Sequence, residues 1–260
     1  MKSSVSALED VMADGWRALE EVRLGGWLLR ASAGFTQRGN SALVVGDPGL
    51  PLSAAVETVE CWYAARSLPA RFALVTDAAG APTDPGLVEE LERRGYVPRS
   101  ATQSMTATCV DIPALVVGAP TVVVDEHLTP TWLAAFAAYR SIVPGAAEAI
   151  LAGSRGQLFL SVPQGSADED PPVAIARMST YPGWAGIHAM WVAPDRRREG
   201  LATAVVATVA RLAVHQGMAQ VYLQVERSNG AARAAYDALG FHTHHGHVYY
   251  AMTEDRAGHS

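Results

Sequence analysis

Between residues 184 and 215 the sequence reads as a strand, an Arg-rich turn and a long apolar helix. The predicted strand at 184–192 ends just before Pro194-Asp195, and apolar residues recur with helical spacing from Leu201 to His215. A helix that begins directly after a turn presents unpaired backbone N–H groups and a partial positive charge. This order predicts a sheet layered with helices, and it favours an anion site at the turn.

The remainder of the second half alternates in the same way. Strands are predicted at 122–124, 157–162, 173–180 and 220–226, with helices at 129–139, 148–153 and 231–239. A final hairpin is predicted over 243–252, with its turn at His245-Gly246. The fold class is therefore α/β (α+β), a mixed sheet flanked by helices.

The first half carries a vaguer version of the same pattern. Strands are predicted at 42–45, 72–76 and 103–108, and helices at 52–65 and 87–94. Gly95-Tyr96 and Gly240-Phe241 close equivalent helices, so we predict an internal duplication. The Pro- and Gly-containing stretch 111–120 divides the chain into two predicted domains, 1–112 and 121–254, and the polar stretch 163–172 is predicted to be a surface loop.

Composition limits the class of protein. A hydrophobic fraction of 49% and a charged fraction of 18% exclude a disordered chain, and a net charge of −6 disfavours binding to nucleic acid. Cys61 and Cys109 are too few to staple 260 residues, which fits a reducing compartment and free, buried thiols. With neither a signal-like N-terminus nor an apolar run long enough to span a membrane, we expect a cytoplasmic protein.

The turn at 194–202 is the most informative stretch for chemistry. Gly200 and Ala202 leave the backbone uncovered, so a phosphate could approach the helix N-terminus closely. Arg196, Arg197 and Arg198 add positive charge there. A solvated Arg-rich turn is the alternative interpretation, because short Gly motifs also occur without a ligand.

A second stretch, Asn229-Gly-Ala-Ala-Arg-Ala-Ala-Tyr236-Asp-Ala-Leu-Gly240-Phe241, follows the strand at 220–226. With both stretches in view, residues 121–254 resemble the GNAT superfamily of acyl-CoA-dependent N-acyltransferases. Arg197, Gly200 and Ala202 match its phosphate-loop pattern, and Asn229, Ala232, Tyr236, Gly240 and Phe241 match its second signature. The resemblance implies two tandem GNAT-like domains, with a degenerate first half.

The resemblance implies a site for acetyl-CoA as cosubstrate. The sheet would splay between the strands at 184–192 and 220–226, and the pantetheine arm would lie in that gap. The CoA pyrophosphate would lie on the backbone amides of 198–203, and the N–H near Val192 would stabilise the oxyanion. The implied CoA contacts are Trp191, Val192, Arg197, Arg198, Glu199, Gly200, Leu201, Ala202, Thr203, Asn229 and Ala232.

The implied chemistry needs an acid for the departing thiolate and a base for the amine. Tyr236 matches the position of the family's general acid, although a core tyrosine is the alternative. Glu226, at the end of its strand, and His188, on the facing strand, are candidate bases. Glu226 could also be an ordinary strand-end carboxylate, His188 a half-buried strand residue, and a chain of waters the actual base.

His242, His244, His245 and His247 gather in the last predicted hairpin. Alternation places His245 and His247 on one strand face, but no Cys or paired carboxylate lies nearby in sequence. We therefore expect no metal, and these histidines could instead border the acceptor pocket.

The first half lacks the chemistry of the second. Gly46-Asp-Pro-Gly-Leu-Pro51 replaces the phosphate loop, and Leu91 stands at the place equivalent to the tyrosine. This half is expected to complete the acceptor groove or to stabilise the catalytic half.

The resulting prediction is an acetyl-CoA-dependent N-acetyltransferase that acts on a primary amine by direct attack. The alternatives are a non-catalytic acyl-CoA-binding sensor or partner-binding module, and a nucleotide-phosphate binder of unrelated fold. The expected partners are an acyl-CoA and an amine acceptor, either a small molecule or a peptide, without nucleic acid or membrane, in a monomer or homodimer. The acidic net charge weakly favours a cationic acceptor.

Overall fold

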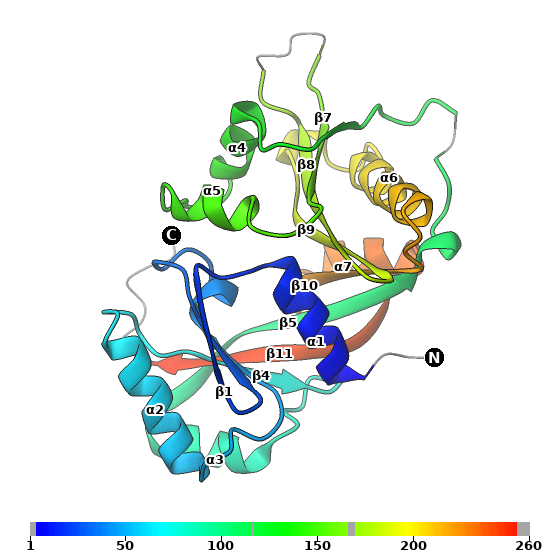
Figure 1. Ribbon diagram of the computed structural model, residues 1–260. Coiled ribbons are helices and arrows are strands. Elements are labelled where there is room, and N and C mark those ends of the chain that lie inside the picture. Colours follow the sequence, from blue (N-terminus) through cyan, green and yellow to red (C-terminus); the bar gives the residue numbers. More distant parts are fainter. Residues whose placement is uncertain (1–3, 116, 166–169, 254–260) are drawn as a thin grey trace.

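A computed structural model describes residues 4–115, 117–165 and 170–253 of the chain. Its eleven strands form one sheet in the order β1-β2-β3-β4-β11-β5-β10-β9-β8-β7-β6 (Figure 1). Helices cover both faces of this sheet, as the α/β (α+β) prediction requires.

The elements have the following bounds. The strands are β1 (Glu20–Leu24), β2 (Trp27–Ala31), β3 (Ala42–Val44), β4 (Phe72–Thr76), β5 (Tyr96–Thr108), β6 (Val123–Asp125), β7 (Leu158–Val162), β8 (Ala174–Tyr181), β9 (Trp184–Val192), β10 (Gln220–Glu226) and β11 (His242–Met252). The helices are α1 (Val5–Gly15), α2 (Leu52–Ala64), α3 (Pro85–Arg93), α4 (Pro130–Ala137), α5 (Ala146–Leu151), α6 (Leu201–His215) and α7 (Gly230–Ala238), with short 3-10 turns η1 (Arg38–Asn40), η2 (Cys109–Asp111) and η3 (Pro194–Arg196).

The strand–turn–helix unit that anchors the sequence prediction is confirmed. The bounds of β9, α6 and β10 coincide with the predicted 184–192, 201–215 and 220–226. Apolar residues of α6 are buried against β8, β9 and β10 in the largest core cluster of the second half. Regular helical and strand periodicity over a buried face explains why this unit is readable from sequence.

The first forty residues form elements that periodicity did not predict. Helix α1 begins after Ser4, whose hydroxyl accepts a hydrogen bond from the Ala7 N–H at 3.2 Å, and it buries Leu8, Val11 and Met12. Strands β1 and β2 then form a hairpin around Gly25, whose φ of +55° favours glycine.

The predicted C-terminal hairpin is wrong. Residues His242–Met252 form one strand, β11, with irregular register at Thr243/His245 and Val248/Tyr250 where it pairs with β5. At Gly246, the proposed turn, a Cβ would stand 2.5 Å from the Thr102 carbonyl oxygen. The glycine serves a close approach between two strands instead of a chain reversal.

Each half of the chain places its last strand beside the other half. β11 lies between β4 and β5, and β5 lies between β11 and β10. The sheet is therefore continuous across the predicted boundary, which falls between η2 and β6 in sequence. The division into domains 1–112 and 121–254 stays a prediction, because an exchanged strand makes each half depend on its neighbour.

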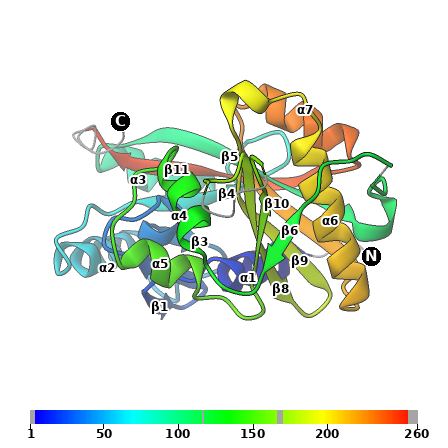
Figure 2. The same cartoon turned by 90° about the horizontal axis from the view of Figure 1, so that it is seen from above.

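The helices separate into two sides of the central strands. Figure 2 shows α7 and α1 on opposite sides of the sheet. On the α6 side the central strands present apolar residues such as Met105, Val221 and Leu223. On the α1 side they present buried polar residues, namely Tyr222, Ser104, His245 and His247. Buried polar groups destabilise the native state unless they are paired, so each of these residues is expected to have a hydrogen-bond or ionic partner.

Other sequence expectations can be compared directly. Cys109 is buried as expected, whereas Cys61 is exposed on α2, and both thiols are free. In the described part of the chain, the helices fall short of the length and apolarity needed to cross a membrane. The predicted loop at 163–172 joins β7 to β8, and its residues 166–169 lie outside the described residues.

Candidate active site

Strands β9 and β10 separate along their length. They pair in parallel from Trp184 with Gln220 to Ile187 with Leu223, and the pairing stops there. Both strands continue, to Val192 and Glu226 respectively. The backbone of 188–192 therefore faces a gap in the sheet, as the resemblance to GNAT proteins predicts.

A bulge lies in β9 at this gap. Its register against β8 shifts between the pairs Ile175–Trp191 and Arg177–His188, so two residues of β9 oppose one of β8. One of them, Ala189, has a φ of +51°, which a non-glycine residue adopts only under constraint. A bulge of this kind bends its strand and re-aims the groups beside it.

Tyr139, which follows α4, holds this bulge in place. Its hydroxyl donates a hydrogen bond to the Ala189 carbonyl oxygen at 3.1 Å, and its ring stacks on Trp191 with centroids 5.4 Å apart. Sequence reasoning placed Tyr139 only in the apolar pattern of a helix. Sequence reasoning could not find this role of Tyr139, because no pattern of residues indicated the bulge.

The Arg-rich turn leads into α6 through an open backbone. Gly200 is the N-cap residue with a φ of +78°, and Arg198 also has a positive φ, of +69°. Among the described residues, no side chain caps the helix, and a Cβ added at Gly200 would meet no atom within 4 Å. The N-terminus of α6 therefore faces open space, which is the requirement for close approach by an anion.

The side chains of this loop divide into two groups. Leu201 is buried in the core, and Ala202 is half-buried. Arg197, Arg198, Glu199 and Thr203 are exposed, and Glu199 forms an ion pair with Arg196 at 2.9 Å. Backbone N–H groups, rather than preformed side-chain contacts, are thus the main feature that this loop offers to a ligand.

Helix α7 follows β10 with the expected cap. The Asn229 side-chain oxygen accepts a hydrogen bond from the Ala232 N–H at 3.1 Å, which fixes the start of the helix. Ala232 packs against the core of the second half. Asn229 thus caps the helix and Ala232 packs in the core, and the contact of both residues with CoA stays a prediction.

Tyr236 lies in α7 with 9% of its surface exposed and its ring 5.8 Å from that of Phe241. Burial raises the pKa of its phenol to about 12. The phenol also lies near enough to Tyr139 to raise the pKa of that residue, in addition to the larger effect of burial. Tyr236 therefore keeps its proton at ordinary pH, which a general acid requires, and its catalytic role stays a prediction.

Glu226 lies at the exposed end of β10. Its carboxylate is 4.0 Å from the guanidinium of Arg140, and both side chains are 58% exposed. Arg140 follows Tyr139, so the segment after α4 reaches from the bulge of β9 to the end of β10. An ion pair of this exposure contributes little to stability, and it leaves the carboxylate open to a substrate.

His188 is buried on the α1 side of the sheet. Its Nε2 lies 2.8 Å from the Ser179 hydroxyl, and its Nδ1 lies 3.4 Å from the Arg38 guanidinium. Burial lowers the pKa of this imidazole well below its usual value, and the nearby guanidiniums of Arg177 and Arg38 lower it further. His188 is therefore a neutral imidazole with both ring nitrogens engaged.

The three candidate catalytic residues are not joined directly. Within residues 4–115, 117–165 and 170–253, no hydrogen bond or ion pair links Tyr236 to Glu226 or His188. The first half nevertheless reaches this region, because Arg38 contacts His188 and Phe35 packs against Phe136 of α4 with centroids 6.2 Å apart. This contact supports the expectation that the first half completes the acceptor groove.

The first half offers no equivalent gap. β3 and β4 pair along their shared length, from Ala42 with Phe72 to Val44 with Leu74. In the loop that follows β3, the Asp47 carboxylate accepts a hydrogen bond from the Gly49 N–H at 2.7 Å, so an acidic group occupies the place of a phosphate. Leu91 is fully buried in α3.

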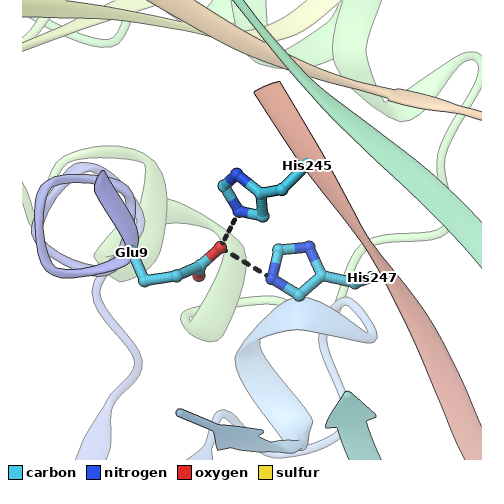
Figure 3. A group of neighbouring side chains, drawn as sticks. All are labelled: Glu9, His245 and His247. Atoms are coloured by element: carbon cyan, nitrogen blue, oxygen red, sulfur yellow. Dashed lines mark hydrogen bonds and ion pairs between the residues drawn. The ribbon is translucent and has the colours of Figure 1, made fainter. Parts of the chain in front are cut away.

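Two histidines of β11 have a partner that the sequence did not predict. His245 and His247 project toward α1, and their Nε2 atoms meet the same carboxylate oxygen of Glu9 (Figure 3). Burial alone would raise the pKa of Glu9, but the two imidazoles lower it far below its usual value. The sequence argument considered only residues near the histidines in the chain, whereas their carboxylate partner, Glu9, lies 236 residues before His245 on α1.

The gap between β9 and β10, the bulge, and the open N-terminus of α6 define a GNAT fold. The sequence profile of the family described as "Probable histone acetyltransferase Rv0428c C-terminal" matches residues 2–250, and the chain belongs to this family. The match spans both halves, so the first half is part of the family's common structure. Membership of the GNAT superfamily supports acetyltransferase activity in general.

Individual relatives agree with this assignment. The chain is 24% identical over 244 residues to the "Uncharacterized N-acetyltransferase YobR" of Bacillus subtilis (strain 168), which covers 91% of this chain and 94% of that protein. A GCN5-related N-acetyltransferase from Kribbella flavida superimposes with a TM-score of 0.70 at 18% identity, over 99% of this chain and 98% of the other. A tandem GNAT protein from the clavulanic acid biosynthesis pathway gives a TM-score of 0.57 at 16% identity, over 81% and 74%.

Proposed function

We propose that this protein transfers an acetyl group from acetyl-CoA to a primary amine by direct attack. The observation that carries the proposal is the gap between β9 and β10, which opens at the bulge of β9, the strand that leads through the turn at 194–200 to the uncapped N-terminus of α6. A linear thioester with a diphosphate at its far end matches a gap with an anion site at its mouth. In this proposal acetyl-CoA is a substrate, which is consumed in each turnover.

In the proposed complex, backbone N–H groups of 198–203 hold the pyrophosphate. The N–H near Val192, directed by the bulge, donates a hydrogen bond to the thioester oxygen. Such a donor typically contributes about 3–4 kcal/mol when charge develops on that oxygen. Tyr139 acts through the bulge and is therefore a positioning residue.

The amine nitrogen attacks the thioester carbon, and the carbonyl oxygen becomes an oxyanion. When the intermediate collapses, the C–S bond breaks and the thiolate takes a proton from the Tyr236 phenol. The amine proton passes to Glu226, directly or through water, because Glu226 is exposed whereas both nitrogens of His188 are engaged. Glu226 then releases its proton to solvent and Tyr236 takes one from solvent, so the enzyme returns to its starting state with no net gain or loss of protons.

The first experiment is thermal unfolding of the full chain with acetyl-CoA, CoA, ATP or NAD. A ligand at 100 times its Kd adds about 2.7 kcal/mol to the native state. We expect acetyl-CoA and CoA to raise the Tm, and ATP and NAD to leave it unchanged. The absence of a shift with acetyl-CoA would contradict the proposed donor.

Thiol release then tests the transfer itself. The acceptor panel contains a polyamine, an aminoglycoside and a lysine-containing peptide, each with acetyl-CoA and the protein. Release of CoA that requires both the amine and Glu226 supports the mechanism. Tight binding of acetyl-CoA without thiol release for any amine favours the alternative of a non-catalytic acyl-CoA-binding module.

A further inference from the structure

A second polar centre lies outside the proposed acetyl-transfer site, between the first helix and the last strand. It consists of Glu9 on α1 and of His245 and His247 on β11, and Figure 3 shows the three side chains pointing toward one another. All three are buried, with 3%, 1% and 2% of their surfaces exposed. Three groups of this kind seldom converge in an interior without a ligand or a proton to share.

The three ligand atoms have the separations of a metal site. Each residue offers one atom, and these atoms all lie within 4.8 Å of one another. The Nε2 atom of His247 lies 2.8 Å from Glu9 Oε1. Ligands about 2.1 Å from a tetrahedral zinc ion lie about 3.4 Å apart, so the observed spacing needs only small side-chain rotations.

Hydrogen bonds alone do not satisfy this cluster. His245 forms a hydrogen bond with Glu9, whereas His247 Nε2 forms no hydrogen bond to the described residues, although it lies 2.8 Å from the same carboxylate oxygen. Two buried ring nitrogens therefore share one carboxylate oxygen, and only one of them has a hydrogen bond to it. A nitrogen without a hydrogen bond is costly in the interior unless an ion or a water satisfies it.

The surroundings supply a polar partner for a second ring nitrogen and a small space beside the ligand atoms. His245 Nδ1 lies 2.8 Å from His244 Nδ1, to which it can donate a hydrogen bond, as the second nitrogen of a metal-bound histidine usually donates to a polar group. A cavity with room for one water lies against Glu9 and His247. Arg30 and Arg38 also line this cavity, and their positive charges favour an anion or hydroxide there.

We propose that Glu9, His245 and His247 bind one divalent transition-metal ion of the zinc class, with water or hydroxide as the fourth ligand. Two imidazoles and one carboxylate are a donor set that zinc accepts. The ion fastens α1, near the start of the chain, to β11, near its end. The proposal is independent of acetyl transfer, since none of these residues belongs to the proposed acetyl-CoA site.

The test uses the full chain, purified without a polyhistidine tag. Metal analysis after dialysis is expected to find about one zinc per chain. After chelation, Co²⁺ serves as a spectroscopic probe, and its visible absorption should saturate at one equivalent and disappear when Zn²⁺ is added. Because metal bound only to the native state stabilises it, the zinc-loaded protein should unfold at a higher temperature than the stripped protein.

Two variants complete the test. His247→Gln is expected to lower Zn²⁺ uptake by at least about tenfold, the loss expected when a ligand is removed. His127→Gln, at an exposed histidine, should bind like the wild type. If the wild type binds neither Zn²⁺ nor Co²⁺, or if both variants bind equally well, the proposal is overturned and the cluster is a hydrogen-bonded trio. The wild-type titration decides even if His247→Gln does not fold.

Discussion

At the scale of a single residue, the ring and the phenol of Tyr236 lie in different environments. Its ring belongs to the core beside Phe241, while its phenol reaches the neighbourhood of Tyr139 at the bulge. The same burial that fixes the ring also raises the pKa of the phenol to about 12. A side chain that stays protonated at every ordinary pH is suited to give a proton to a thiolate and not to accept one from an amine.

Replacing this phenol tests the role. Tyr236→Phe is expected to lower kcat by about 100-fold, the lower end of typical general-acid contributions, and to leave acetyl-CoA binding nearly unchanged. Since Tyr236 is protonated below pH 12, its loss should lower the rate equally across the accessible range and leave the midpoint of the pH profile in place. Rate measurements from about pH 6 to about pH 10 decide this point.

Tyr181→Phe is the matched control, because Tyr181 is 38% exposed at the end of β8, away from the gap. It should have wild-type kinetics. If Tyr236→Phe kept the wild-type kcat, Tyr236 would be only a core aromatic.

At the scale of elements, α6 has a glycine at each end, and the two glycines can be compared. Gly200 before the helix and Gly217 after it have φ values of +78° and +77°, and a Cβ at either would meet no atom within 4 Å. The backbone cost of an alanine is therefore the same at both positions, about 1–2 kcal/mol. Only the first of them faces the proposed pyrophosphate site.

This equality makes a controlled experiment possible. Gly200→Ala and Gly217→Ala should lower the Tm of the free protein by similar amounts. Only Gly200→Ala should weaken acetyl-CoA binding, by about tenfold if the methyl group and the altered cap cost about 1.4 kcal/mol. Calorimetric titration with acetyl-CoA measures the difference. Equal affinities in the two variants would place the pyrophosphate elsewhere.

The elements differ in how far their sequences predict them. Long periodic segments such as α6, β9 and β10 have the predicted bounds because one buried face repeats along each of them. The N-terminal helix and hairpin were missed. The gap beside β9 could be inferred only from the resemblance, since the end of strand pairing leaves no residue pattern.

The centre formed by Glu9 shows the same limit for a site. The spacing of His245 and His247 correctly placed both on one face of a strand, but Glu9 stands 236 residues before His245 in the chain. A partner at that distance follows from the packing of α1 on the sheet, which local patterns do not encode. The long-range order of the strands likewise decided that β11 is not a hairpin.

At the scale of the whole molecule, the exchange of final strands makes the two halves interdependent. β11 would lose β4 and β5 if the halves were separated, and β10 would lose β5. Unpaired central strands expose long rows of backbone groups. Folding of either half by itself is therefore not expected.

Cutting the linker tests this dependence. A protease site introduced between Pro113 and Pro120 should yield two fragments that remain together in gel filtration, because the sheet crosses the cut. The intact protein should unfold in a single calorimetric transition whose calorimetric and van't Hoff enthalpies agree. Two separate transitions, or fragments that separate as folded species, would instead support the division into independent domains.

The position of β11 also matters for how the protein is made. During synthesis the first half leaves the ribosome long before residues 242–252, yet the place between β4 and β5 belongs to those residues. Domains generally fold as they emerge, but this sheet cannot close until residues 242–252 have been synthesised. Until then the nascent chain exposes the unpaired edges of β4 and β5, which a chaperone that shields strand edges would protect.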